Sequence, residues 1–187
     1  MKNRNTSTTL HYCFNLYPKY YEALAAAVRY FKPLHALEIG LWVGRSAYAL
    51  LNNSPNSTLI SIDPVSHEES TEFLEKTFPG RFTYRQGYSP DALYTLRGKT
   101  FDWVYIDGEH TEKAVTADLL GVVPLLDNDG VIVLDDYNIT EVREAVDMFM
   151  KEHAEKKLYS FNDLGFSDSG CPSQIVAIVG KERAFEL

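Results

Sequence analysis

Short apolar runs alternate with amphipathic stretches from residue 21 to near the end of the chain. Short continuous apolar runs bounded by turn residues are typical of strands buried in a sheet. The pattern predicts strands at residues 35–40, 58–63, 81–86, 101–106, 131–134, 158–161 and 174–179. The run at 101–106 is nearly continuous in apolar and aromatic side chains, so we expect it at the centre of the sheet.

Helical periodicity fills the segments between these strands. The first helix begins near residue 21, and Pro33 follows its end. Further helices are predicted at residues 45–51, 68–78, 90–96, 111–126 and around 142–149. Strands that alternate with helices favour an α/β fold, with a doubly wound, mostly parallel sheet covered on both faces. The last two strands are expected to form a hairpin-like pair.

The strand ends carry the candidate chemistry. In open parallel sheets, ligands bind beyond the carboxyl ends of the strands, where the strand order reverses. Acidic side chains recur at four of the five ends that we consider, and we therefore expect one shared crevice. The residues at these ends are Glu38 with Gly40, Asp63, Gln86 with Gly87, Asp107, and Asp135 with Asp136.

The segment 38–46, Glu-Ile-Gly-Leu-Trp-Val-Gly-Arg-Ser, joins the first strand to the next helix. A turn of this kind exposes backbone N–H groups at a helix N-terminus, where a negative ligand group is stabilised. Glu38 adds a carboxylate at the end of the strand. A carboxylate beside free amides suits a zwitterionic ligand better than a bare phosphate.

Asp63 ends the second strand, 23 residues after Gly40. A carboxylate at this place in a nucleoside-binding sheet accepts hydrogen bonds from ribose hydroxyls. The alternative is a turn aspartate before Pro64. The first turn lacks the dinucleotide fingerprint, because Leu41 and Trp42 stand where that fingerprint needs its second glycine. This substitution weakens the case for an NAD-dependent oxidoreductase.

Taken in order, these motifs resemble those of class I S-adenosylmethionine-dependent methyltransferases. Glu38-Ile39-Gly40-x-x-x-Gly44-x-Ser46 resembles the first motif of the catechol O-methyltransferase-like and small sugar O-methyltransferase families. The later motifs follow at residues 106–110, 118, 124–126, 130–133 and 135–137. The resemblance implies a Rossmann-like methyltransferase fold with strand order 3-2-1-4-5-7-6 and strand 7 antiparallel. From chain length and the polar composition of the N-terminus, we expect an N-terminal arm at 1–17 and a single methyltransferase domain at 18–187.

The same resemblance implies S-adenosylmethionine as the cofactor and assigns its contacts. Glu38 and the turn from Gly40 to Gly44 are expected to hold the methionine part, with Ser46 near its carboxylate. Asp63 is expected to bind the ribose. Residues 86–89, which include Gln86 and Gly87, are expected beside the adenine. Trp42 departs from the pattern, because many methyltransferases carry a glycine there.

Asp107 is expected to face both the cofactor and the reactive centre. An alcohol or phenol acceptor must lose its proton, and a general base or a bound cation can promote this loss. His110 follows Asp107 closely and is a candidate for the general base. Alternatively, His110 contacts the cofactor or caps the next helix at Thr111.

Asp107, Asp135 and Asp136 are candidate ligands for Mg²⁺. Converging carboxylates repel one another unless a cation or a proton intervenes, and hard oxygen ligands suit Mg²⁺. The resembling sugar and catechol enzymes imply such a site. Adjacent strand residues point to opposite faces, so both aspartates converge only if the chain turns immediately after Leu134. Otherwise one of them caps the following segment and the other attracts the sulfonium.

Composition narrows the choice of partners. The chain has 187 residues and a formal net charge of -8, which predicts one domain and disfavours nucleic-acid binding. No apolar run approaches the roughly 20 residues needed to cross a membrane. Cys13 and Cys171 lie far apart, which fits a reducing cytoplasm. A homodimer is expected from base rates alone.

We therefore expect methyl transfer to a small-molecule acceptor, with a hydroxyl oxygen favoured. One alternative is an NAD-dependent oxidoreductase. Another is a non-catalytic domain that binds a nucleoside cofactor. Cover for the acceptor is expected from the N-terminal helix, the loop at 87–90 or the loop at 162–173. We also expect the N-terminal segment to help form the acceptor site.

Overall fold

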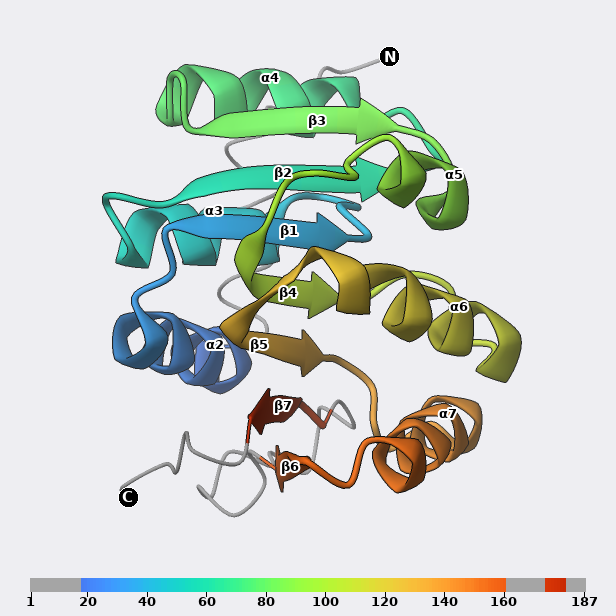
Figure 1. Ribbon diagram of the computed structural model, residues 1–187. Helices are drawn as coiled ribbons and strands as arrows, with labels where there is room; N and C mark the ends of the chain where they lie inside the picture. Colours follow the sequence, from blue (N-terminus) through green and yellow to red (C-terminus); the bar gives the residue numbers. More distant parts are fainter. Residues whose placement is uncertain (1–17, 161–173, 181–187) are drawn as a thin grey trace.

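The computed structural model describes residues 18–160 and 174–180. A seven-stranded sheet runs through them in the order β3-β2-β1-β4-β5-β7-β6 (Figure 1). β7 lies antiparallel to both of its neighbours, β5 and β6, whereas β1 to β5 pair in parallel. The predicted fold class, strand order and antiparallel strand are confirmed. The strands are β1 (His35–Ile39), β2 (Thr58–Asp63), β3 (Phe82–Gln86), β4 (Phe101–Ile106), β5 (Leu126–Leu134), β6 (Lys156–Ser160) and β7 (Val176–Gly180).

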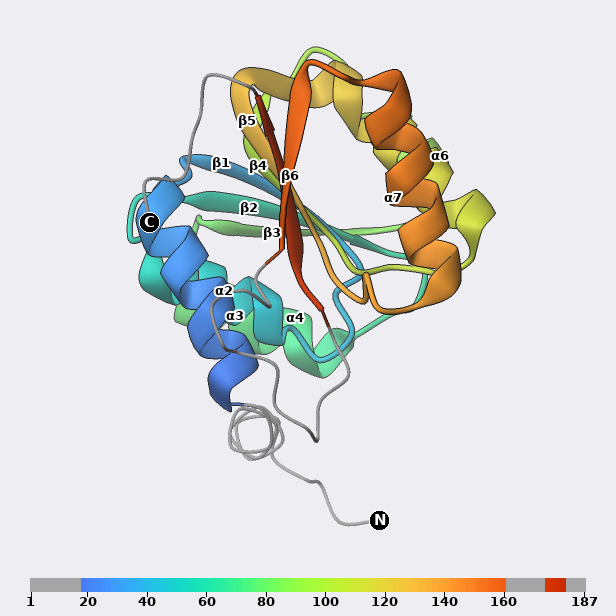
Figure 2. The ribbon, with the colours of Figure 1, turned by 90° about the horizontal axis from the view of Figure 1, so that it is seen from below.

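Helices cover both faces of the sheet. α2, α3 and α4 lie on one face, and α6 and α7 lie on the other (Figure 2). α5 packs beside α6. The helices are α2 (Pro18–Phe31), α3 (Arg45–Asn53), α4 (Glu68–Thr77), α5 (Ser89–Tyr94), α6 (Glu112–Val122) and α7 (Thr140–Glu152).

The central strand β4 explains why both faces are filled. Successive side chains of a strand point to opposite faces, and here both directions are apolar. Trp103 and Tyr105 join the core under α2 and α3, whereas Val104 and Ile106 join the core under α6 and α7. A nearly continuous apolar run is therefore the pattern that a strand between two helical layers requires, as the sequence predicted.

The connection from α6 to β5 differs from the predicted one. The helix ends at Val122 and a single 3₁₀ turn, Val123–Leu125, follows it, whereas the periodicity predicted helix to residue 126. Pro124 has no N–H, so it cannot continue the α-helical hydrogen bonds. β5 already begins at Leu126, which pairs with Phe101, and the register shifts before the next pair. Residues 127–130, which separate the predicted helix from the predicted strand, thus form an irregularity within β5.

Some expectations fall outside the described residues. They are the N-terminal arm at 1–17, the covering loop at 162–173, and both cysteines. Among the helices that the structure describes, none has the length and apolar character that a membrane crossing requires.

Candidate active site

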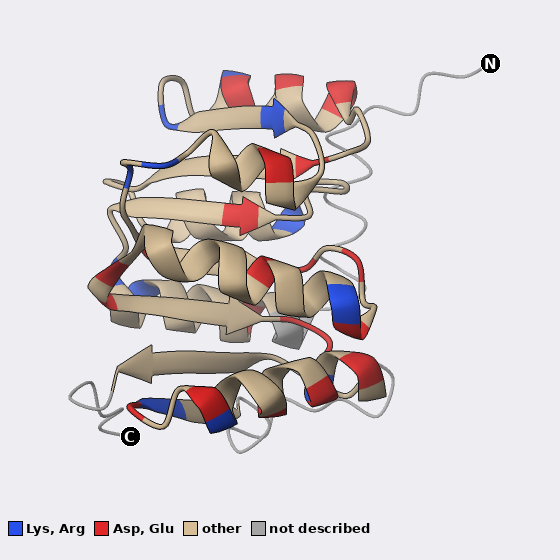
Figure 3. Ribbon diagram, turned by 45° about the vertical axis from the view of Figure 1, so that its right-hand side comes forward, with Lys and Arg blue, Asp and Glu red and all other residues tan. Residues whose placement is uncertain are grey.

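A cavity of about 650 Å³ opens at the carboxyl ends of the central strands. This volume lies within the range usual for small-molecule sites. Four of the predicted site residues line it, namely Gly40, Asp63, Gly87 and Asp107. Figure 3 shows that acidic residues gather at this edge of the sheet. The predicted crevice therefore exists, and it includes part of the predicted residue set.

The other seven predicted residues are absent from the cavity wall, and they are Glu38, Gly44, Ser46, Gln86, His110, Asp135 and Asp136. Glu38 and Ser46 hydrogen-bond to each other, and the exposed Gln86 donates from Nε2 to the Pro64 carbonyl, 3.2 Å away. Gly44 has φ 75°, and a Cβ there would come within 2.8 Å of a Leu74 side-chain atom. The close packing of the start of α3 on α4 therefore explains this glycine.

Glu38 is enclosed by hydroxyl groups at the end of β1. The residue is 2% exposed. Ser46 on α3 donates to Oε1 at 2.5 Å, and Ser61 on β2 donates to Oε2. Burial raises the pKa of Glu38 to about 8, although both hydroxyls act to lower it. Glu38 therefore joins two strands and a helix, and it carries a proton near neutral pH.

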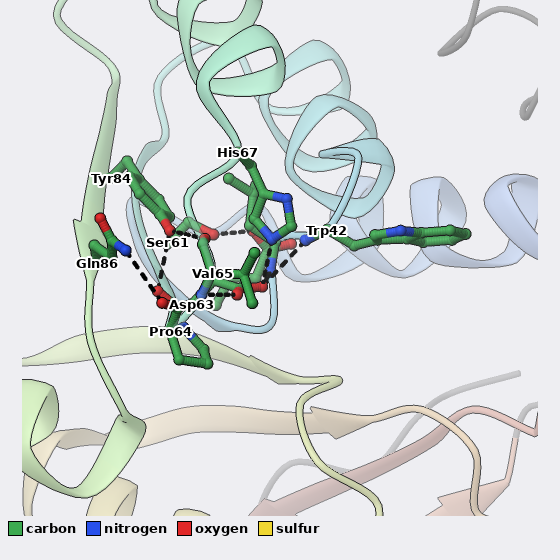
Figure 4. A network of polar contacts seen from close by, with 10 residues as sticks. Trp42, Ser61, Asp63, Pro64, Val65, His67, Tyr84 and Gln86 are labelled. Carbon is green, nitrogen blue, oxygen red and sulfur yellow. Dashed lines mark hydrogen bonds and ion pairs between the residues drawn. The ribbon is translucent and has the colours of Figure 1, made fainter.

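Asp63, in contrast, is enclosed by backbone amides at the end of β2 (Figure 4). Its Oδ2 accepts from the N–H groups of Leu41 at 2.9 Å and Trp42 at 3.3 Å. Its Oδ1 accepts from the Val65 N–H at 2.8 Å, and His67 Nε2 lies 3.1 Å from Oδ2. Burial acts to raise the pKa of Asp63, but the three amides and His67 outweigh it, so the pKa is lowered. Asp63 is thus both the turn aspartate of the alternative interpretation and a wall of the cavity.

The turn after β1 does not present its amides as predicted. The N–H groups of Leu41 and Trp42 are used by Asp63, and the Gly44 N–H donates to the Leu41 carbonyl at 2.7 Å. Trp42 has φ 43°, which is unusual for a bulky residue, and 62% of it is exposed. The Arg45 guanidinium carbon lies 4.6 Å from the centre of its ring, so the two groups attract. The carboxylate of Asp63 therefore holds a turn whose backbone is strained at Trp42.

Gly40 brings the first turn against the loop after β4. Its φ is 93°, and a Cβ at this position would lie 1.9 Å from the Asp107 carbonyl oxygen. The Asp107 N–H donates to the Ile39 carbonyl at 2.8 Å. Only glycine leaves room for this backbone contact. The two loops therefore form one continuous wall of the cavity.

His110 lies between two carboxylates beside this wall. Its Nε2 is 3.4 Å from Asp107 Oδ1 and 3.4 Å from Asp136 Oδ2. The hydrogen bond to Asp107 raises the pKa of His110, against the effect of partial burial. Burial raises the pKa of Asp107, and Asp136 adds to this, whereas His110 lowers it. The three side chains form a compact acid–base cluster that could also hold a cation.

Asp135 does not join this cluster. β5 ends at Leu134, and Asp136 adopts φ 55°, so the chain turns where the sequence argument required it. The turn brings only Asp136 to Asp107. Asp135 is buried, where Tyr105 Oη donates to its Oδ2 at 3.2 Å and its Oδ1 accepts from the Asp136 N–H. The predicted set of three aspartates is therefore replaced by two aspartates and His110.

Residues 37–137, more than half of the chain, match a family model described as a methyltransferase domain. The protein belongs to this methyltransferase family. The match confirms the family resemblance predicted from the ordered motifs. No curated protein matches the methyltransferase chain by sequence.

Solved methyltransferases share the fold at low sequence identity. The O-methyltransferase TomG from Streptomyces achromogenes is 18% identical, with 96% of this chain and 91% of that one covered and a TM-score of 0.71. An O-methyltransferase from Bacillus cereus is 17% identical, with 87% and 81% covered and a TM-score of 0.67. The methyltransferase PaMTH1 from Podospora anserina is 18% identical, with 84% and 76% covered and a TM-score of 0.64.

Sequence reasoning missed two side chains that belong to the site. No sequence motif includes His67, yet it contacts Asp63. Asp118 entered only as one member of the ordered motifs, yet it lines the cavity. The helical spacing gave a signal for Asp118, because an acid in line with the buried Val115 and Val122 predicts an inward-facing carboxylate.

Proposed function

We propose that this methyltransferase transfers a methyl group from S-adenosylmethionine to a hydroxyl oxygen of a small molecule. Two of the structural relatives support the choice of cofactor, because TomG was solved in complex with SAM and the Bacillus cereus enzyme with SAH. Both are described as O-methyltransferases. The strongly acidic chain, with a net charge of -8, favours a small acceptor over a nucleic acid.

The cavity fits the proposed cofactor. Its wall combines apolar side chains such as Ile39 and Ala117 with the carboxylates of Asp63 and Asp107. Asp63 Oδ1 accepts from the Val65 N–H and has a second lone pair, so the carboxylate can still accept from a ribose hydroxyl. The lowered pKa of Asp63 keeps it an acceptor at neutral pH.

The His110 cluster is the observation that carries the proposal of a hydroxyl acceptor. With the Nε2 proton held between Asp107 and Asp136, the other ring nitrogen can accept a proton. A hydroxyl that loses its proton to His110 becomes the nucleophile for the methyl group. Alignment of donor and acceptor in the cavity supplies the rest of the rate enhancement.

Mg²⁺ is a further part of the proposal. Asp107 and Asp136 offer carboxylate oxygens close enough to share one cation, whereas Asp135 is held by Tyr105. A bound Mg²⁺ supplies Lewis-acid stabilisation of an ionised hydroxyl. The chain's own task is then to hold the two carboxylates and His110 on one side of the acceptor.

Calorimetric titration tests the proposed cofactor. We expect S-adenosylhomocysteine to bind and NAD to give no heat. Transfer of a labelled methyl group to a panel of phenols and sugars then tests the acceptor class. Binding of NAD alone would instead support the oxidoreductase alternative, and cofactor binding without transfer to any hydroxyl would contradict the proposed reaction.

Replacing His110 with Ala tests the general base. We expect kcat to fall by about 10²–10⁴-fold, with the affinity for S-adenosylhomocysteine unchanged. His153→Ala is the matched control, because His153 contacts Glu155 at the end of α7, and it should retain full activity.

EDTA treatment of the active enzyme tests the cation, and unchanged turnover would remove Mg²⁺ from the proposal.

A further inference from the structure

Asp118 is another carboxylate on the cavity wall, outside the cluster of Asp107, His110 and Asp136. Asp118, on α6, is only 3% exposed, yet it lines the cavity together with Ser89 at the start of α5. The Ser89 hydroxyl donates to Asp118 Oδ1. Oδ2 lies next to Gly108, where a Cβ would be 3.6 Å from it. Within residues 18–160 and 174–180, no second hydrogen-bond donor is found for this carboxylate.

A buried carboxylate with one donor is costly unless a ligand supplies another. Burial is the main reason why the pKa of Asp118 is raised to about 6. The hydrogen bond from Ser89 acts to lower this pKa, and the negative charge of Glu109 acts to raise it. Above about pH 7.5 the group is therefore ionised and can only accept hydrogen bonds. Its position on the cavity wall shows the direction from which a donor can come.

The wall around Asp118 suits a flat ring. Ala114 and Ala117, on the same helix, and Pro90, on α5, present small apolar surfaces to the cavity. A planar, largely apolar group with one N–H donor at its edge would satisfy both the apolar surfaces and the carboxylate. The adenine of the proposed cofactor has this character, because its amino group donates.

We propose that Asp118, held in place by Ser89, accepts a hydrogen bond from the adenine amino group and thereby selects an amino-purine over an oxo-purine. This inference rests on the proposed use of S-adenosylmethionine. It adds a specificity-determining residue on α6 to the loop at 86–89 that the sequence placed beside the adenine. Ser89 is then a positioning residue for Asp118.

The test compares two ligands by calorimetry at pH 8. S-adenosylhomocysteine carries the amino group, and S-inosylhomocysteine carries a carbonyl oxygen at the same purine position. We expect the full-length wild-type protein to prefer S-adenosylhomocysteine by about 100-fold, because a site built around a donor rejects an analogue that lacks it. Equal affinities in the wild-type protein would overturn the inference while leaving the proposed cofactor in place.

Asp118→Asn sharpens the test, because the amide can keep the Ser89 bond and offer a donor instead of an acceptor. We expect the affinity for S-adenosylhomocysteine to fall about tenfold and the affinity for S-inosylhomocysteine to rise. Glu112→Gln, an exposed substitution on the same helix, should keep the wild-type preference. An equal loss for both ligands would mean a merely structural role. If the wild-type protein binds neither ligand, the proposed function fails and the inference fails with it.

Discussion

The neighbouring strands β1 and β2 each carry a buried carboxylate near the carboxyl end, and the pKa values of the two are shifted in opposite directions. Glu38 is 2% exposed and Asp63 is 8% exposed. The pKa of Glu38 is raised to about 8, mainly by burial, whereas the pKa of Asp63 is lowered although burial opposes this. The partners differ: Glu38 meets two hydroxyls, and Asp63 meets three backbone amides and His67.

The difference shows that the kind of donor decides which form of a buried acid persists. A hydroxyl can donate or accept, so a protonated Glu38 still has all of its hydrogen bonds. A backbone amide can only donate, so the three amides favour the ionised form of Asp63, which is the better acceptor. The two acids therefore suit different tasks. Glu38 is a neutral connector within the protein, and Asp63 is a charged group at the edge of the cavity.

Asp63→Ala removes the charged member of this pair of acids and has the largest expected effect. Three N–H groups, those of Leu41, Trp42 and Val65, would lose their acceptor. We expect the free energy of unfolding to fall by roughly 3–5 kcal/mol. The affinity for S-adenosylhomocysteine should fall by about 100-fold, because the turn and the proposed ribose contact are both lost.

Urea denaturation and calorimetric titration measure these two effects. Asp63→Asn serves as the graded control, since one amide oxygen remains to accept. If the Ala variant kept the wild-type stability and affinity, the central role given to Asp63 would be wrong.

Glu38→Gln replaces the neutral member of the pair and should stabilise the protein at high pH. Because the folded pKa of about 8 exceeds the value near 4.5 expected for an unfolded chain, the folded state binds the extra proton between these two limits. The stability that this group contributes is present below pH 4.5 and declines as the pH rises to about 8. A neutral Gln avoids that loss. At pH 8 the free energy of unfolding of the variant should therefore exceed that of the wild type by on the order of 2–3 kcal/mol.

Thermal unfolding at pH 5 and pH 8 measures this prediction. The variant and the wild type should be similar at pH 5 and should separate at pH 8. Glu112→Gln, which removes an exposed carboxylate, should show no such separation. A Gln variant that is less stable at both pH values would mean that Glu38 is needed as an anion.

Tyr84→Phe removes a hydroxyl that contacts the backbone beside the Asp63 carboxylate, and it has the smallest expected effect. Tyr84 Oη donates to the backbone carbonyls of Asp63 at 3.0 Å and Val65 at 2.5 Å, as Figure 4 shows, and leaves the carboxylate untouched. We expect a loss of about 1 kcal/mol in stability and little change in cofactor affinity. If differential scanning calorimetry and titration instead gave losses as large as those of Asp63→Ala, the carboxylate would not be the dominant group.

The sequence predicted the sheet well because its strands carry strong signals. Buried strands need apolar side chains on both faces, and the run at Phe101–Ile106 shows this directly. The α6–β5 connection was less well predicted. Turn residues at 127–130 carry the same local preferences whether they end a helix or interrupt a strand, and only the pairing with β4 decides between the two.

The site was predicted as a region more successfully than as a set of contacts. Strand ends placed Asp63 and Asp107 correctly at the cavity, because topology alone brings them together. Side-chain directions depend on distant partners that a pattern does not show. Tyr105, on a neighbouring strand, holds Asp135 away from the cluster, and Asp63 takes the amides that were expected to face a ligand.

The contact between Gly40 and the Asp107 carbonyl has a consequence for how this enzyme could diversify. With no space for even one methyl group at that junction, the turn after β1 and the loop after β4 are packed together at the middle of the sheet. Neither can be reshaped alone. Substitutions that change the shape of the cavity are therefore expected at its periphery.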